Sequence, residues 1–374
     1  MRTRDDGAHT FRRPSSTILS RIRATVLRLL HARLTELVVA TYNLFSSNGH
    51  GKMTYKHEVE LGPNLYRHLL GAPESRLFHE KHINQIRHPA DILREHLETL
   101  SKLFQKIANM GKAEISDEER AELTKSVILR LDEFYEQLQV IIKCFTPPSS
   151  FQDKGRLDDA LRSGNKQAWD CFYGRTKNIH EPIRIAANAL KHAGARLMFI
   201  QITSHLNVEV NGFYLSRLIG EDDQRGPDPK IHGKYRGKIN TAFSFNHFLV
   251  NVVGRVHCYM DSLDKALFEK SAASPMSPLP IFDALVLSGS HLSRDFFPDE
   301  YAKPYTKIEK SGRFYTAEFP CRYKCRANEN PDSIRSVRMP INVNPRTSAS
   351  NSMMPYIQLI HPEKDLGLER SPWR

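Results

Sequence analysis

The chain has 374 residues, of which 40% are hydrophobic and 26% are charged. These values are ordinary for a globular protein, and they exclude a chain that is disordered throughout. The longest apolar runs fall short of the ~20 residues that a membrane-spanning helix needs, so the sequence predicts no membrane segment. Five cysteines, an odd number, occur without a secretory signal, which indicates a reducing compartment and leads us to expect a cytoplasmic protein.

The net charge of +12 is concentrated in two segments. Residues 1–34 hold eight Arg against two Asp, and residues 303–346 hold ten Lys or Arg against four acidic residues, so each segment has a net charge of +6. The rest of the chain sums to zero. Two basic segments on a neutral body predict contact with a polyanion, although solvated surface charge would give the same counts.

After a flexible start at 1–14, the sequence predicts an amphipathic helix that runs to about Ser46. Apolar residues recur at helical spacing from Ile18 to Leu37, and Arg21 and Arg28 lie on the opposite face. A mitochondrial transit peptide has a similar composition. Because the helix continues past a cleavable length, we favour a structural helix whose two arginines bind nucleic acid.

Three more long helices complete a predicted helical domain at 15–194. One covers 89–110 and begins at Pro89, and a second runs from the capping box that starts at Ser116 to about Phe145. The third covers 166–192 and ends before Gly194, and a short helix at 157–161 precedes it. Four histidines near the first of these helices are predicted to lie on the surface, because their spacing does not fit a zinc motif: His79, His82, His88 and His96.

The hydrophobic period changes after Gly194. Residues 196–203 and 208–218 predict a β-hairpin, and Ser244 caps a further helix to about Glu269. Between them, 220–240 is predicted as a long loop whose cations bind nucleic acid: Lys230, Lys234, Arg236 and Lys238. We expect 195–270 to pack on the helical domain and 271–374 to form a mixed region, with a Pro/Ser linker at 271–280 and a second hairpin near Lys310. The predicted fold class is α+β, mainly α.

The helix at 166–192 carries the residues best suited to chemistry. Arg184, Asn188, Lys191 and His192 stand at i, i+4, i+7 and i+8, so they share one face. A histidine can transfer a proton while cations stabilise charge on a pentacoordinate phosphate. RNA supplies its own nucleophile, the 2′-hydroxyl, so neither a metal ion nor another cofactor is required. Simpler roles are also open, because cations at a helix C-terminus interact favourably with the helix dipole and the arginines could pair with acidic residues of 116–136.

The run from Asn188 to His192 resembles the R-N-x-x-x-H signature of the HEPN superfamily (higher eukaryotes and prokaryotes nucleotide-binding). The resemblance covers roughly residues 89–194. It implies a helical bundle, often a homodimer, and in many members a metal-independent endoribonuclease of toxin–antitoxin or antiphage systems. The Arg of the signature falls at Ala187 in this chain, and Arg184 lies one turn earlier. Arg175 and His180 also fit an R-x4-H spacing, close to Pro182, which is expected to disturb the helix.

We therefore expect an RNA-binding protein with metal-independent endoribonuclease activity. His192, Asn188, Arg184 and Lys191 are the expected catalytic residues, with Arg175 and His180 as the alternative pair. A non-catalytic basic module that binds nucleic acid or an acidic protein partner remains the other interpretation. The sequence contains no phosphate-binding glycine loop and no nucleophile elbow, so the common nucleotide triphosphatase and serine hydrolase sites are not expected.

Overall fold

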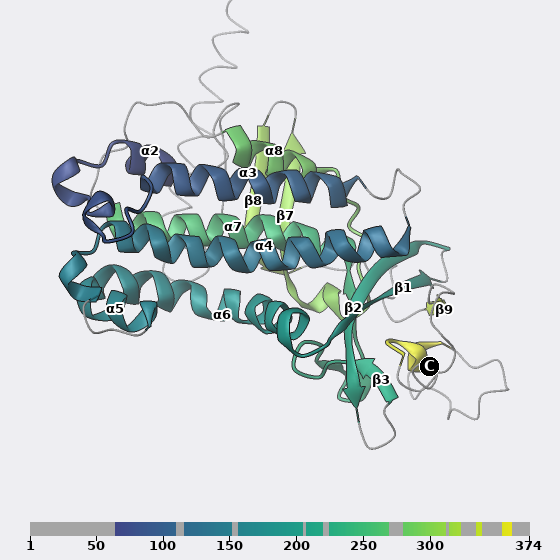
Figure 1. Cartoon of the computed structure of the whole chain (residues 1–374). Coiled ribbons are helices and arrows are strands. Elements are labelled where there is room, and N and C mark those ends of the chain that lie inside the picture. Colours follow the sequence, from purple (N-terminus) through teal and green to yellow (C-terminus); the bar gives the residue numbers. More distant parts are fainter. Residues whose placement is uncertain are drawn as a thin grey trace, which may run out of the picture. The chain divides into compact units, whose positions relative to one another are not determined.

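The structure, a computed structural model, describes residues 64–109, 116–151, 156–204, 207–219, 224–268, 280–311, 314–322, 334–338 and 354–360. Within these ranges the fold is α+β and mainly α, as the sequence predicts (Figure 1). The predicted helix that ends near Ser46, with Arg21 and Arg28, lies outside the described residues.

Three of the long helices begin at or directly after the residues that the sequence predicts: Pro89, Ser116 and Ser244. In α3 (Pro89–Ala108) the His88 ring accepts a hydrogen bond from the Ala90 amide at 3.3 Å. In α4 (Asp117–Cys144) the Ser116 hydroxyl accepts from the Glu119 amide at 3.1 Å, and Ser244 plays the same part for α7 (Phe245–Phe268). Such contacts satisfy amides that have no partner within the helix. The remaining helices are α2 (Leu65–Leu70), α5 (Leu157–Gly164), α6 (Lys166–His192) and α8 (Pro280–Ser290).

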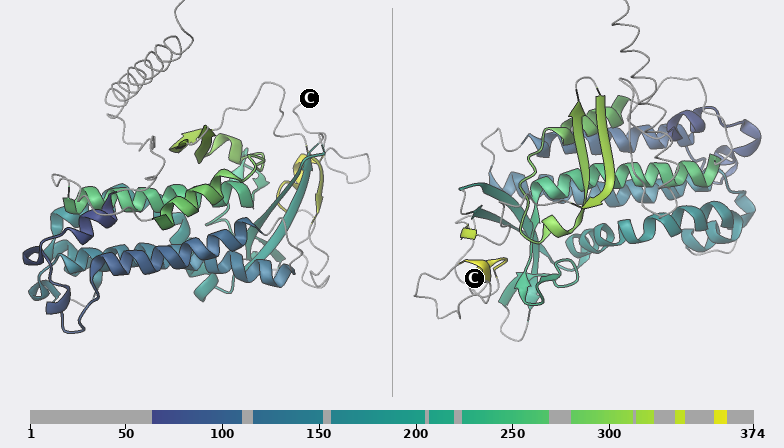
Figure 2. Two further views of the ribbon diagram at one scale, coloured as in Figure 1. Left: turned by 90° about the horizontal axis from the view of Figure 1, so that it is seen from above. Right: turned by 180° about the vertical axis from the view of Figure 1, so that it is seen from behind.

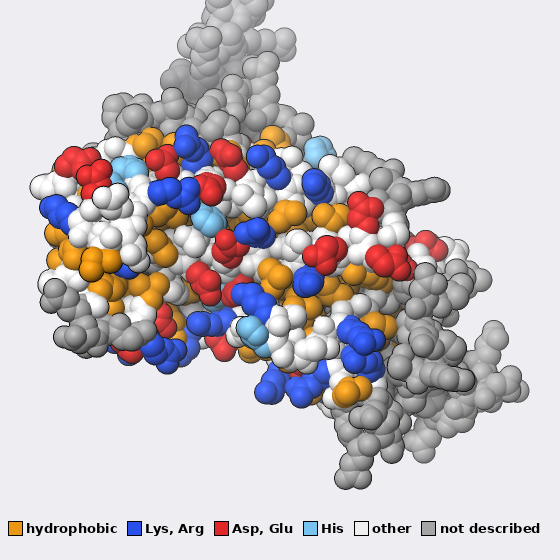
Figure 3. All heavy atoms as spheres, viewed as in Figure 1, with side chains coloured by type: hydrophobic (Ala, Val, Ile, Leu, Met, Phe, Trp, Pro, Cys, Tyr) orange, Lys and Arg blue, Asp and Glu red, His pale blue; other side chains and the backbone are white. Residues whose placement is uncertain are grey.

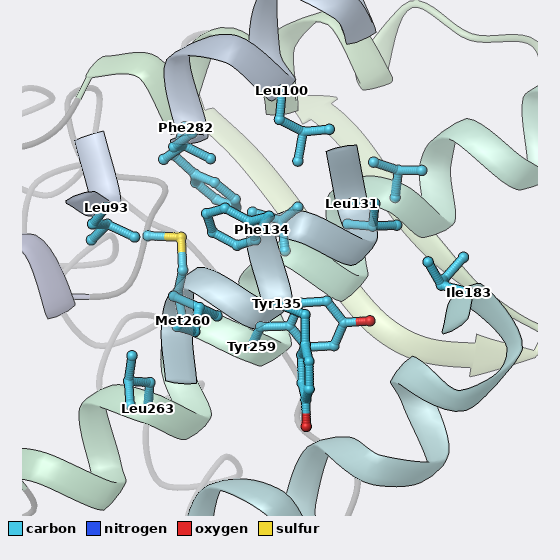
Figure 4. Packing of buried hydrophobic residues seen from close by; sticks show 14 of the residues in the cluster. Leu93, Leu100, Leu131, Phe134, Tyr135, Ile183, Tyr259, Met260, Leu263 and Phe282 are labelled. Atoms are coloured by element: carbon cyan, nitrogen blue, oxygen red, sulfur yellow. The ribbon is translucent and has the colours of Figure 1, made fainter. Parts of the chain in front are cut away.

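Four long helices, α3, α4, α6 and α7, form the body of the fold (Figure 1). α4 packs between α3 and α6, α7 packs against both α4 and α6, and α8 lies against α3. Their apolar sides meet in one large core, where Leu131, Phe134 and Met260 have almost no exposed surface (Figure 4). Phe199 and Phe213 of the sheet belong to the same core, so it continues across the predicted boundary after residue 194.

The predicted hairpin is confirmed as β1 (Arg196–Ser204) and β2 (Glu209–Ile219), which pair antiparallel. The sheet has the order β3-β2-β1-β9, with β3 (Gln224–Pro227) and β9 (Ile334–Arg338) outside, and β6 (Phe243–Ser244) also pairs with β2. Successive side chains alternate between the faces. Phe213 and Leu215 join the helical core, whereas Tyr214 belongs to a second cluster on the other face. β9 was not predicted.

The stretch 220–240 is not the long loop that its composition predicts. Besides β3, it contains β4 (Lys234–Tyr235) and β5 (Ile239–Asn240), which pair with each other. Arg236 and Gly237 have positive φ angles of 51° and 77°, and the Lys238 amide donates to the Tyr235 carbonyl at 3.3 Å. This geometry is typical of a tight hairpin turn. Residues 234–240 therefore form a small basic hairpin.

The second predicted hairpin is also present. β7 (Pro304–Ser311) pairs antiparallel with β8 (Phe314–Arg322), and the pair lies over α7 and α8 (Figure 2). Residue 280, predicted to end a linker, is instead the first residue of α8. Among the described helices, none combines the length and the apolar character required to cross a lipid bilayer.

The prediction of surface histidines is wrong for His79 and His82, which are both buried. The His82 Nε2 lies 3.1 Å from the carbonyl oxygen of Lys143, and its ring packs edge-on against Phe151. These contacts hold the segment before α3 against the end of α4. A polar side chain can be buried in this way when its hydrogen-bonding atoms find partners.

Candidate functional site

The outward side of α6 carries the four residues that the sequence places on one face. Arg184, Asn188, Lys191 and His192, named here the α6 polar face, are all exposed. Ala187, where the Arg of the HEPN signature would stand, is fully buried. An arginine there would point into the core, so Arg184 is the cation that shares a side of the helix with Asn188 and His192.

Lys191 is held by a buried carboxylate. Its Nζ lies 3.0 Å from Asp132 Oδ2, and the other oxygen of Asp132 lies 3.3 Å from His180 Nε2. The Asp132 and His180 side chains are each only 4% exposed, whereas the Lys191 side chain is 36% exposed. Lys191 thus ties α6 to α4, and its charge is largely balanced before any ligand arrives.

Burial and hydrogen bonds favour the neutral form of His180. Burial lowers the pKa of His180, more than the neighbouring Asp132 raises it. Burial also opposes ionisation of Asp132, but the bonds from His180 and Lys191 outweigh this effect and hold the pKa of Asp132 below its ordinary value. A neutral imidazole donates from Nε2 to Asp132, and its Nδ1 accepts from the Tyr259 hydroxyl at 3.3 Å. His180 also stacks on Tyr135, with ring centroids 3.7 Å apart, so it serves the core and is closed to substrate.

The alternative pair, Arg175 and His180, is not brought together. Arg175 is exposed while His180 is buried, and nine residues of helix place Arg175 half a turn away from Arg184. α6 runs without interruption through Pro182. Arg255 of α7 donates to the carbonyl oxygen of Ile179, in the turn before Pro182.

A second group of cations lies at the end of the sheet that follows α6. Arg196, the first residue of β1, pairs with Ser216 of β2, which in turn pairs with Pro227 of β3. Neighbouring strands lie about 5 Å apart, so the backbone of Arg196 is about 10 Å from that of Pro227, three residues before Lys230. Arg196, Arg217 and Lys230, named here the basic sheet end, are all exposed. Arg217 also lies 3.7 Å from the buried Asp228.

The charges of α4 and α6 are opposite. α6 holds five Lys or Arg and two acidic residues, a net charge of +3, whereas α4 holds four Lys or Arg and seven acidic residues, a net charge of −3. The surface reflects this difference, because Lys and Arg side chains gather over α6 and the beginning of the sheet in the lower part of Figure 3. Arg184 and Arg196 form no ion pair within the described part of the chain.

Sequence reasoning missed Arg196, Arg217 and Asp132. The two arginines belong to predicted strands, but only the register of the sheet brings them to the end of α6. Asp132 carried a detectable signal, since a carboxylate between Leu131 and Phe134 interrupts an apolar stripe and so indicates a buried polar partner.

No group of His, Cys, Asp and Glu side chains among the described residues is arranged to hold a metal ion. Comparison with protein-family models, with curated proteins and with solved structures finds no match to this chain. The resemblance to the HEPN signature therefore stays a prediction.

Proposed function

We propose that this chain binds RNA through the α6 polar face together with the basic sheet end. The observation that carries the proposal is the group of exposed cations on α6 and at the end of the sheet that follows it: Arg184, Arg196, Arg217 and Lys230. Cations that neutralise phosphates release condensed counterions, and this release drives binding to nucleic acids. Cations gathered on α6 and the adjoining end of the sheet suit such a ligand.

Asn188 and His192 favour RNA over an acidic protein as the ligand. Both are exposed on the same side of α6 as Arg184. An amide and an imidazole can donate and accept hydrogen bonds, so they can contact base edges and 2′-hydroxyls as well as phosphates. An acidic protein surface offers carboxylates, which need only the cations.

The binding proposal is tested with a labelled single-stranded RNA. We expect the affinity to fall steeply between 50 and 200 mM salt, as counterion release requires. Arg184→Glu combined with Arg196→Glu should weaken binding at least ~10-fold, because two phosphate contacts become repulsive. Arg94→Glu with Arg130→Glu changes the net charge equally, but on α3 and α4, and should have little effect. Equal losses in the two double variants would show that net charge alone binds the RNA, and the site would be wrong.

A second candidate function is RNA cleavage, favoured by the exposure of His192 on the same side of α6 as Arg184. In this reaction the 2′-oxygen attacks the adjacent phosphorus and the 5′-oxygen of the next nucleotide leaves. The products are a 2′,3′-cyclic phosphate and a 5′-hydroxyl. One proton leaves the 2′-hydroxyl and one reaches the departing oxygen, and His192 would transfer one of them. Arg184 would stabilise the charge on the phosphorane, and Asn188 would orient the phosphate.

Cleavage is tested with His192→Ala, which should lower the rate ~100- to 10,000-fold, the contribution of general acid–base catalysis. His291→Ala removes another exposed histidine and serves as the matched control. EDTA should leave the rate unchanged, because the proposed step uses no metal. Equal activity of the wild type and His192→Ala would exclude His192 as the proton carrier. Binding without cleavage would favour the non-catalytic module.

A further inference from the structure

Residues 354–360 cover the face of the sheet that points away from the helical core. Tyr356 is fully buried, and Leu359 is 8% exposed. The Tyr356 ring lies 5.2 Å from that of Phe297, in a cluster that also contains Ile202 and Tyr214. At the end of the segment, Ile360 forms a parallel bridge with Ile334 of β9. This segment is therefore part of the packed fold.

Tyr356 bonds to the chain that closes the basic hairpin. Its amide donates to the carbonyl of Asn240, the last residue of β5, at 3.0 Å. Its hydroxyl lies 3.0 Å from the amide nitrogen of Ala242 and 3.2 Å from the carbonyl oxygen of the same residue, and it also bonds to the Asp299 carboxylate. One tyrosine thus holds residues on both sides of Thr241.

The basic hairpin is short. Its strands β4 and β5 contain two residues each, and a hairpin of that size is marginal in water. Its base is fixed by Thr241, whose hydroxyl donates to the Gly233 carbonyl at 2.8 Å, and by a bond from Lys234 to the side chain of Asn240. Because Asn240 also accepts from Tyr356, the position of the hairpin depends on the segment 354–360.

We propose that Tyr356 is a positioning residue for the basic hairpin, which it fixes so that Lys234, Arg236 and Lys238 form a rigid extension of the anion-binding surface. All three side chains are exposed. Rigid cations lose less conformational entropy when a ligand binds than mobile ones do. The positioning itself follows from the contacts above, while the identity of the anion as RNA rests on the proposed function.

The variant Tyr356→Phe tests the contribution of the Tyr356 hydroxyl separately from that of its ring. Tyr356→Phe keeps the apolar packing but leaves the Ala242 amide without its acceptor, while Asp299 loses one partner and keeps Lys303. Amide hydrogen exchange at residues 239–242 should then become ~10-fold faster or more, since a buried group without its hydrogen bond favours local opening. Exchange in α3 and α4 should stay at the wild-type rate. Tyr301→Phe removes a hydroxyl that accepts from the Phe296 amide, and should leave 239–242 unchanged.

The same proteins are then tested for RNA binding. If RNA is the anion, Tyr356→Phe should weaken binding several-fold and Tyr301→Phe should not. Faster exchange at 239–242 together with no RNA binding by any variant, the wild type included, would uphold the positioning role and overturn the proposed ligand. Unchanged exchange at 239–242 would overturn the positioning role itself.

A measurement on the wild type decides the question if Tyr356→Phe fails to fold. The amides of Ala242 and Tyr356 both bond across the contact between 354–360 and the base of the hairpin, since Ala242 donates to the Tyr356 hydroxyl and Tyr356 donates to the Asn240 carbonyl. A single opening should therefore expose both amides. Their protection factors should agree within a factor of about two and should decrease equally with denaturant. Protection factors that differ tenfold or more would show that the hairpin opens independently of 354–360.

Discussion

The inward and outward sides of α6 use similar residues for different purposes. On the inward side, His180 donates to Asp132 and stacks on Tyr135, and every polar contact stays within the protein. On the outward side, Arg184 and His192 are exposed to solvent. The role of a histidine on a helix can therefore be assigned only when its burial is known. Here His180 has the most contacts with its neighbours, but it is buried and no substrate can reach it.

α4 sharpens the contrast, because it has almost the same length as α6 and the opposite charge. Two explanations compete for this difference. The helices could be charged to attract each other, and the contact between Lys191 and Asp132 does this at one point. Alternatively, the outward charge of α6 serves a ligand. The two explanations make different predictions. If the charges attract the helices to each other, their removal should lower the free energy of unfolding, whereas charges that serve a ligand can be removed without this loss.

The largest expected effect is on the buried imidazoles. Burial lowers the pKa of His232, His247 and His257 to about 3, so each stays neutral in the fold while it takes up a proton in the unfolded chain below about pH 6.5. Stability is therefore lost as the pH falls below that value, by about 2 kcal/mol for each imidazole at pH 5. Glu300 acts in the opposite direction, because burial and Asp299 raise its pKa to about 8. Its protonation as the pH falls offsets roughly the loss of stability from one of the three imidazoles.

Urea unfolding at pH 7 and pH 5 measures this loss, which we expect to be about 4 kcal/mol in total. His257→Gln should reduce the difference in the free energy of unfolding between the two pH values by about 2 kcal/mol, the share of one imidazole. His192→Gln, at an exposed position on the outward side of α6, serves as the control. The same pH dependence in wild type and His257→Gln would show that His257 becomes protonated within the fold.

The next effect comes from the junction between α4 and α6. Asp132→Ala removes the acceptor of both His180 and Lys191, and loss of one partner from a buried charged contact costs about 3 kcal/mol or more. Lys191 is partly exposed and can turn to solvent, so the lower end of that range is expected. Glu136→Ala, an exposed position one turn later in α4, should cost less than about 0.5 kcal/mol. Chemical denaturation gives both values, and similar costs would mean that Asp132 is not held as described.

The helices could be predicted from the sequence because their signals are local. Ser116 and Ser244 cap α4 and α7 through hydroxyls that contact amides three residues later. α8 escaped prediction because Pro280–Ser290 is apolar on most sides and has no helical period. β3 and β9 escaped because short strands depend on partners that lie elsewhere in the chain.

The candidate site was predictable only in part, for the same reason. Helical spacing is enough to place Arg184, Asn188 and His192 on one exposed side. The engagement of Lys191 could not be predicted, since its partner Asp132 lies in another helix, 59 residues away. Nor does spacing reveal burial, which closes His180 to solvent. Contacts between elements, and not the motif, separate the two histidines of α6.

The smallest expected effect is the one that decides between the two explanations of the charge difference. Arg184→Ala and Asn188→Ala change exposed positions whose side chains have no ion pair within the described residues, so each should alter the free energy of unfolding by less than about 0.5 kcal/mol. Lys191→Ala serves as the comparison and should cost more, because it removes one of the two partners of Asp132. Equilibrium denaturation at low and moderate salt measures all three. If Arg184→Ala cost as much as Lys191→Ala, and the cost faded with salt, the charge of α6 would serve attraction to α4. A negligible cost for Arg184→Ala, combined with weaker RNA binding, would leave its charge free for a ligand.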